Sequence, residues 1–152
     1  MEQTIVEANG LLFACLAAGE PDHPLLLLLH GFPDNSWTWE HQFAPLAAAG
    51  YRVVAPFLRG HPPTDIPANG FYDGATLAED VRGLIAALSP GRPAFLVGQD
   101  WGAALSYGLL ALYPDLVARA VVMAIPHPAA MAASLADPAQ LKRAFHWWYF
   151  QL

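Results

Sequence analysis

One aspartate stands between two glycines at the point where an apolar run ends. The run Phe95–Val97 stops at Gly98, and Asp100 precedes Gly102 and a stretch of small residues. This order is typical of a strand, a tight turn and a helix start, in which flanking glycines let the turn hold one side chain clear of both elements. A carboxylate that faces the first free N–H groups of a helix is kept ionised by the partial positive charge of that helix end. An ionised carboxylate can attack carbon. Asp100 could also be only the N-cap of that helix, and this stretch alone leaves both interpretations open.

A second element belongs beside this turn. Five leucines, Leu25–Leu29, lead into the sequence His-Gly-Phe-Pro at residues 30–33. A short apolar run bounded by turn residues predicts a strand that is buried on both faces of a parallel sheet. We expect the loop after this strand to lie next to Asp100.

Strand and helix patterns alternate around these two stretches. Strands are expected at residues 4–6, 11–16, 25–29, 51–55, 95–97 and 118–125, the first two joined by the turn Asn9-Gly10. Helices are expected to run from the caps at 34–36 to Gly50, from a capping box at Thr76–Glu79 to Ser89, and from Asp100 to Tyr113. The alternation predicts an α/β fold, a mostly parallel sheet with helices on both faces.

The chain resembles the α/β-hydrolase family, and within it the branch of epoxide hydrolases and haloalkane dehalogenases. The residues that carry the resemblance are His30-Gly31-Phe32-Pro33, Arg59-Gly60, Gly98-Gln99-Asp100-Trp101-Gly102 and Tyr149-Phe150-Gln151. The resemblance implies an α/β-hydrolase fold in which residues 1–128 form the N-terminal part of the core and residues 129–152 begin a cap domain. It also implies that the chain is an N-terminal fragment truncated at the start of the cap, and that the Phe32-Pro33 bond is cis.

In this branch the elbow aspartate attacks the substrate carbon, and water activated by a histidine hydrolyses the resulting alkyl ester. The resemblance implies that Asp100 is the nucleophile and that the backbone N–H groups of Phe32 and Trp101 form the oxyanion hole. The substrate pocket is expected to include Trp37, His146, Trp147 and Tyr149. The expected partners are a small apolar organic substrate, an epoxide or an alkyl halide, and water.

No residue of the chain matches the family's catalytic histidine or its acid. The family order is nucleophile, acid and then histidine, and only His127 and His146 follow Asp100. Neither occupies the catalytic position. His30 precedes the elbow and is expected to brace the oxyanion loop rather than to move protons. We therefore expect the 152-residue chain to be alkylated without turnover.

Three positions bear on the substrate. His146 stands where epoxide hydrolases usually have a cap tyrosine that donates a proton to the opening ring, a task that histidine can also perform. Phe32 stands where haloalkane dehalogenases commonly have asparagine, and Trp101 stands where fluoroacetate dehalogenases have arginine. His146 is thus a departure from the epoxide hydrolase pattern and Phe32 a departure from the haloalkane dehalogenase pattern, whereas Trp101 does not discriminate between these two groups. The resemblance as a whole favours an epoxide hydrolase-like enzyme. The alternatives are a haloalkane dehalogenase-like hydrolase and a non-catalytic ligand binder of the same fold.

Composition and charge narrow the partners further. A net charge of -6 with only 7 lysines and arginines argues against nucleic acid and anionic lipid. The longest leucine run is far shorter than the ~20 residues of a membrane-spanning helix, and no signal peptide is expected. The single Cys15 excludes an internal disulfide and is consistent with a cytoplasmic protein. No metal ion and no cofactor are expected.

The chain is unusually apolar. Its hydrophobic fraction is 55% without glycine, whereas an average protein reaches about 45–50% with glycine included. Either its surface is unusually apolar or part of the protein that covers it is missing. In the second case the strand at 118–125 is an exposed sheet edge, and self-association through it is expected.

Overall fold

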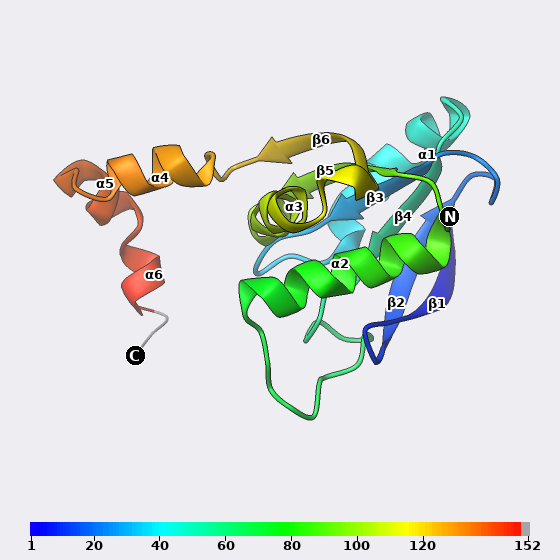
Figure 1. Ribbon diagram of the computed structural model, residues 1–152, viewed down its shortest axis with the longest axis horizontal. Coiled ribbons are helices and arrows are strands. Elements are labelled where there is room, and N and C mark those ends of the chain that lie inside the picture. The colour runs from blue at the N-terminus through cyan, green and yellow to red at the C-terminus, as the bar shows by residue number, and fades with distance from the viewer. Residues whose placement is uncertain (150–152) are drawn as a thin grey trace.

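The computed structural model describes residues 1–149, except for the side chains of residues 147 and 148. The strands are β1 (Glu2–Ala8), β2 (Leu11–Ala18), β3 (Leu25–Leu29), β4 (Arg52–Pro56), β5 (Ala94–Gln99) and β6 (Val117–Met123). Within the described residues they form one six-stranded sheet in the order β1-β2-β4-β3-β5-β6 (Figure 1). β2 pairs antiparallel with β1 and β4, and the neighbours from β4 to β6 are parallel. The predicted α/β-hydrolase architecture is confirmed.

Helices cover both faces of the sheet. The helical segments are η1 (Ser36–Trp39), α1 (Glu40–Ala48), α2 (Gly74–Leu88), α3 (Trp101–Leu112), η2 (Pro114–Leu116), α4 (Pro128–Ser134), α5 (Pro138–Arg143) and α6 (Phe145–Tyr149), of which η1 and η2 are 3₁₀ helices. α2 and α3 pack against one face of the sheet, and η1 and α1 against the other. The fold around β3 and β5 is therefore a three-layer sandwich of helix, sheet and helix.

The five leucines of β3 are all buried because both faces of this central strand are covered. Leu25, Leu27 and Leu29 contribute to the core beneath α2 and α3, whereas Leu26 and Leu28 contribute to the core beneath η1 and α1. Successive side chains of a strand point to opposite faces. An unbroken apolar run is thus what a central strand of a two-sided parallel sheet requires.

Cys15 lies in β2 within the core that α2 and α3 cover, and its side chain is buried. Burial raises the pKa of its thiol to about 12. Only the thiolate is a strong nucleophile. The Cys15 side chain is therefore unreactive at neutral pH while the sheet is intact.

α2 begins earlier than the predicted capping box. Its N-cap is Asp73, whose Oδ1 accepts hydrogen bonds from the backbone N–H groups of Ala75 at 3.1 Å and Thr76 at 3.0 Å. The hydroxyl of Thr76 donates to Oδ2 of Asp73 at 2.7 Å, and these bonds, led by the one from the hydroxyl, hold the pKa of Asp73 below its usual range. The capping box prediction is wrong because a stronger cap stands three residues upstream of Thr76.

The long loop between β4 and α2 is tied to β2. Thr64 Oγ1 accepts a hydrogen bond from the N–H of Ala14 at 3.0 Å and donates one to the carbonyl of Phe57 at 2.6 Å. One residue on, the N–H of Asp65 donates to the carbonyl of Leu12 at 3.1 Å, and Asp65 Oδ2 accepts from the N–H of Leu12 at 2.9 Å. The loop is thereby held in place beside the sheet.

A buried ion pair ties the start of this loop to α2. Arg59 donates from Nε and Nη2 to the two carboxylate oxygens of Asp80, each at 2.6 Å, and Asn9 Nδ2 donates to Asp80 Oδ1 at 2.7 Å. Both charged side chains are almost fully buried. A bidentate pair of this kind fixes geometry as well as charge, so the loop after β4 has a defined position.

β6 is the last strand of the sheet among the described residues. Its apolar side chains are only partly covered, with Val121 56% and Met123 40% exposed. α4, α5 and α6 continue beyond β6 and extend away from the sheet (Figure 1). The division at residues 128 and 129 falls in the first turn of α4, and the assignment of the following residues to a cap remains a prediction. Among residues 1–149, no helix has the length and apolar character needed to cross a membrane.

Candidate active site

Asp100 occupies the turn between β5 and α3 with φ 53° and ψ −116°. A positive φ is uncommon for residues other than glycine and persists only where the surrounding structure enforces it. The predicted strained turn at Asp100 is confirmed. The Phe32-Pro33 bond opposite it is cis, as expected.

Three glycines allow the chain segments around this turn to approach one another. A Cβ atom at Gly98 would lie 2.2 Å from the carbonyl oxygen of Gly102, and one at Gly102 would lie 2.0 Å from that of Leu29. A Cβ atom at Gly31 would lie 2.4 Å from Cβ of Asp100. No side chain fits at these distances, so the elbow, α3 and the loop after β3 are in direct contact only because these positions are glycine.

The side chain of Asp100 turns toward the loop after β3. Its Oδ1 accepts a hydrogen bond from the backbone N–H of Phe32 at 2.9 Å, and it makes no capping bond to the N–H groups of α3. The backbone carbonyl of Asp100 accepts from Ala103 and Ala104 at 2.9 and 3.1 Å. The carboxylate is therefore not a side-chain cap of α3. It faces the N–H group that the sequence assigned to the oxyanion hole.

His30 holds that N–H group in position. Its Nε2 accepts a hydrogen bond from the N–H of Leu58 at 3.0 Å, so the proton of the neutral ring is on Nδ1, which donates to the carbonyl of Gly31 at 2.9 Å. Burial lowers the pKa of His30 to about 4, which keeps the ring neutral. The Gly31 carbonyl and the Phe32 N–H belong to one planar peptide unit. Fixing the carbonyl thus aims the N–H at Asp100, which agrees with the predicted bracing role of His30.

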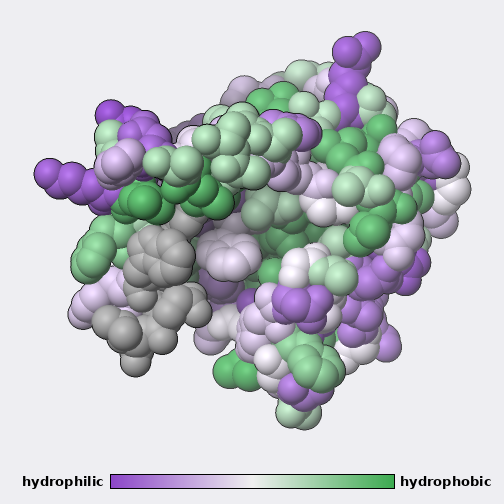
Figure 2. All heavy atoms as spheres, turned by 60° about the vertical axis from the view of Figure 1, so that its left-hand side comes forward, coloured by the Kyte–Doolittle hydropathy of each residue, from purple (hydrophilic) through white to green (hydrophobic). Residues whose placement is uncertain are grey.

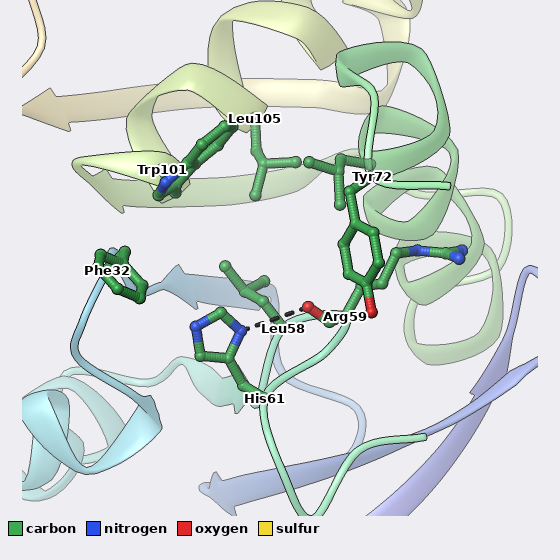
Figure 3. A pocket seen from close by; sticks show the side chains of 8 residues that line it. Phe32, Leu58, Arg59, His61, Tyr72, Trp101 and Leu105 are labelled. Atoms are coloured by element: carbon green, nitrogen blue, oxygen red, sulfur yellow. Dashed lines mark hydrogen bonds between the residues drawn. The ribbon is translucent and has the colours of Figure 1, made fainter. Parts of the chain in front are cut away.

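A cavity of about 110 Å³ opens beside the elbow (Figure 3). It is lined by Phe32, Leu58, Arg59, His61, Tyr72, Leu77, Trp101 and Leu105. Phe32, which is hydrogen-bonded to Asp100, and Trp101, which follows Asp100 in the sequence, form one end of the cavity. Tyr72 lies at the other end. Phe32 is 53% exposed and Trp101 is 50% exposed. The cavity is therefore open to solvent at the end next to Asp100.

Most of the residues that line this cavity were not assigned to a site from the sequence. Leu77 and Leu105 fall on apolar stripes of α2 and α3, where a lining residue has the same pattern as a core residue. Leu58 and His61 lie in the loop that begins after β4 ends at Pro56. Because the carboxyl ends of neighbouring parallel strands meet at one edge of the sheet, their place after β4 was the signal that could have found them.

The predicted pocket residues outside the elbow lie elsewhere. Trp37 is in η1 and is 43% exposed, and His146 and Tyr149 are exposed on α6. None of these three lines the cavity, and the side chain of Trp147 lies outside the described residues. Figure 2 shows a hollow between the C-terminal helices and the core, with apolar side chains at its floor. The assignment of these four residues to a substrate pocket stays a prediction.

His127 caps a helix. Its Nδ1 accepts a hydrogen bond from the N–H of Ala129 at 3.3 Å at the start of α4, and its ring packs edge-on against Tyr107 at 5.5 Å between centroids. In the part of the chain that the structure describes, no group of three or more His, Cys, Asp or Glu side chains is placed to hold a metal ion.

Comparison with known proteins agrees with this geometry. A family model described as the alpha/beta hydrolase fold matches residues 24–152. The chain is 39% identical to the AB hydrolase superfamily protein YfhM of Bacillus subtilis over 97% of its own length and 52% of that protein. It is 36% identical to Epoxide hydrolase 4 of Mus musculus over 97% of its length and 41% of that protein.

A solved structure is also similar. The crystal structure of Epoxide Hydrolase A from Mycobacterium thermoresistibile superposes with a TM-score of 0.79 at 36% identity, covering 95% of this chain and 44% of that one. The chain spans about half the length of the curated relatives that it matches.

Proposed function

This chain belongs to the α/β-hydrolase fold family, and from that premise we propose that it carries the nucleophile of an epoxide hydrolase-like enzyme, with Asp100 attacking an epoxide carbon. The observation that carries the proposal is the hydrogen bond from the Phe32 N–H to Asp100 Oδ1 at 2.9 Å. It joins a strained acidic residue to a backbone donor that His30 orients. The names of the similar proteins, among them several epoxide hydrolases, support the choice of substrate class.

The two carboxylate oxygens take different roles in this reaction. Oδ1 accepts the hydrogen bond from Phe32, so Oδ2 is the oxygen that forms a bond to the epoxide carbon. The ring C–O bond breaks, its electron pair goes to the ring oxygen, and that oxygen takes up a proton. The product is an ester of Asp100 in which Oδ1 is the carbonyl oxygen. His146, whose place in the sequence is that of the family's proton-donating tyrosine, is the candidate source of that proton.

Hydrolysis of the ester uses the same donor again. Water adds to Cγ of Asp100, and the negative charge that develops on Oδ1 is stabilised by the N–H of Phe32 and, in our assignment, by that of Trp101 at the first turn of α3. Collapse of this intermediate releases the diol and restores the carboxylate. The step needs a base for the water, and His127, which caps α4, and His146 do not match the family's base. We therefore assign ester formation, and not ester release, to the 152-residue chain.

Mass spectrometry of the intact chain tests this proposal without requiring turnover. Incubation with 1,2-epoxybutane is expected to add one whole substrate mass to the peptide that contains Asp100, and Asp100→Asn is expected to abolish the addition. Asp115→Asn is the matched control, since it removes an exposed carboxylate on η2 that is not part of the elbow. Sustained diol formation by the wild-type chain would contradict the assignment of ester formation alone.

Two further outcomes separate the alternatives. With 1-bromobutane the same attack expels bromide, so the added mass is that of the butyl group less one proton. Addition from the bromide and not from the epoxide would indicate a dehalogenase-like hydrolase. No addition from either reagent, with the fold intact by circular dichroism, would indicate a ligand binder and would overturn the proposal.

A further inference from the structure

The cavity beside Asp100 has almost entirely apolar walls. Leu58, Leu77 and Leu105 line it. The rings of Phe32 and Trp101 stand at its open end (Figure 3). Leu77 lies in α2, Leu105 in α3 and Leu58 in the loop after β4, so three separate elements converge on it. A cleft of this kind favours an apolar group and gives up little hydrogen bonding to water when it is filled.

Two polar side chains in the wall, those of Arg59 and His61, are hydrogen-bonded within the protein. The guanidinium of Arg59 is bound to both oxygens of the buried Asp80. His61 Nδ1 lies 3.3 Å from the carbonyl of Arg59, which only accepts, so this nitrogen is the donor (Figure 3). The ring of Tyr72 lies against Gly60, where a Cβ atom would be 2.7 Å from it. The positive charge of Arg59 is thus compensated by Asp80 and is not available to a carboxylate on a substrate.

The size of the cavity limits what it can hold. Cavities of about 150 Å³ with apolar walls bind benzene, which has six carbons. A volume of about 110 Å³ corresponds on the same scale to about four carbons. A straight butyl group matches this volume. Phe32 lines the open end and donates its backbone N–H to Asp100, so we expect the atom that carries the butyl group to lie on the Asp100 side of the cavity.

We propose that this cavity binds the substituent of the epoxide and selects a straight apolar chain of about four carbons, with the Leu77 side chain, which lines the cavity, as one of the groups that limit its volume. The preferred substrate is then a terminal epoxide such as 1,2-epoxyhexane, whose butyl chain fills the cavity. The proposal rests on the proposed function for the chemistry at Asp100, while the shape of the cavity is independent of it.

A series of terminal epoxides that differ only in chain length measures the preference of the cavity for chain length. The terminal epoxides from 1,2-epoxypropane to 1,2-epoxydecane present the same ring, so differences in the alkylation rate of Asp100 report the chain. Burying one CH₂ group is worth ~0.8 kcal/mol, which is about fourfold in rate. We expect the second-order rate of adduct formation to rise about fourfold per added carbon up to 1,2-epoxyhexane and then to level off.

Two substitutions at one position should move this limit in opposite directions. Leu77→Ala enlarges the cavity, so the rate should continue to rise to 1,2-epoxyoctane. Leu77→Phe fills the cavity, so the limit should move down to 1,2-epoxybutane. Leu88→Ala is the matched control, because Leu88 is a buried leucine of the same helix that does not line the cavity. It should leave the position of the limit unchanged.

Binding of the unreactive 1,2-alkanediols of the same chain lengths separates this proposal from the one on chemistry. Affinity measured by calorimetry should follow the same chain-length profile and the same shifts in the Leu77 variants. If no epoxide alkylates Asp100 but the diol profile is obtained, the proposed function fails and the pocket assignment is supported. A diol profile that is flat, that keeps rising to the ten-carbon member, or that is unchanged by both Leu77 variants would overturn the pocket assignment.

Discussion

The backbone N–H of Asp100 donates a hydrogen bond to the carbonyl oxygen of Met123, with an N···O distance of 3.2 Å. Met123 is the last residue of β6, and the next residue, Ala124, has a φ of 69°. Two non-glycine residues with positive φ therefore lie on either side of one hydrogen bond. Strained residues cluster in this way where the surrounding structure holds a functional group, so the end of β6 is part of the support of the elbow.

Replacing Ala124 with glycine should stabilise the protein. The left-handed conformation costs an alanine roughly 1–2 kcal/mol, and the greater freedom of glycine in the unfolded chain offsets part of the gain. We expect the free energy of unfolding in urea to rise by about 0.5–1 kcal/mol. Ala120→Gly in the middle of β6 is the control and should lower it by a similar amount. Equal destabilisation by both variants would contradict strain at Ala124.

A methyl group at Gly102 should disrupt the elbow. Its Cβ atom would lie 2.0 Å from the carbonyl oxygen of Leu29, and backbone cannot move away as a flexible side chain can. We expect Gly102→Ala to cost about 3 kcal/mol or more of unfolding free energy, measured by thermal denaturation, and to abolish alkylation of Asp100. Gly74→Ala should be neutral or slightly stabilising, since a Cβ atom there meets nothing within 4 Å at the start of α2.

The stability of the protein should fall in mild acid because of His30. Its pKa is lowered from 6.5 to about 4 in the folded protein. Between these values the unfolded chain binds a proton that the folded protein does not, so the free energy of unfolding falls as the pH falls through this window. The contribution of neutral His30 to the free energy of unfolding is complete above pH ~6.5 and is lost by about pH 4. Since a shift of one pKa unit corresponds to ~1.4 kcal/mol, this contribution is roughly 3 kcal/mol.

His30→Asn should flatten this part of the pH profile in urea titrations. An amide can donate to the carbonyl of Gly31 and accept from the N–H of Leu58, but it does not titrate. The titratable groups that act on the imidazole are His61, whose ring centroid lies 4.7 Å away, and Asp34. His41→Asn, at an exposed position, should leave the profile unchanged. An identical slope in wild type and His30→Asn would contradict the prediction.

The 152-residue chain should associate with itself through β6. Within the described residues β6 pairs on one side only, and the side chain of Val121 is 56% exposed. Unpaired backbone groups beside an apolar surface favour pairing with another strand. Sedimentation velocity should show species larger than the monomer as concentration rises, and Val121→Lys should suppress them. Leu112→Lys, on α3 and 53% exposed, adds the same charge and should not. A monomer at all concentrations would contradict this.

The strands and the elbow were predictable from the sequence because each has a local cause. The five leucines of β3 report burial on both faces of a strand, and Gly98 and Gly102 report a turn too tight for side chains. The start of α2 was missed because Thr76 and Asp73 are both good caps, and only the three-dimensional structure decides between them. The local sequence pattern therefore predicts that a helix or strand exists more reliably than it predicts the residues at which that element begins and ends.

The cavity could not be predicted in the same way. Leu77 and Leu105 look like core residues until α2, α3 and the loop after β4 are placed together. The position of that loop depends on the bonds of Thr64 to β2 and of Arg59 to Asp80, which join residues far apart in sequence. Contacts of this kind leave no periodic signal in one chain. The turn that holds Asp100 is set by neighbouring residues of the sequence, whereas the cavity beside it depends on the assembled fold.

Because the thiol of Cys15 is buried in β2, its chemical modification can be used to detect opening of the sheet. With a pKa of about 12 and no exposure, the thiol does not compete with Asp100 for an electrophile while the sheet is intact. Once β2 separates from its neighbours, the thiol regains its ordinary acidity and reacts rapidly. The rate at which a small disulfide reagent modifies Cys15 therefore gives a protection factor for the sheet. An epoxide adduct and a thiol adduct on one spectrum would report, respectively, the closed and the opened protein.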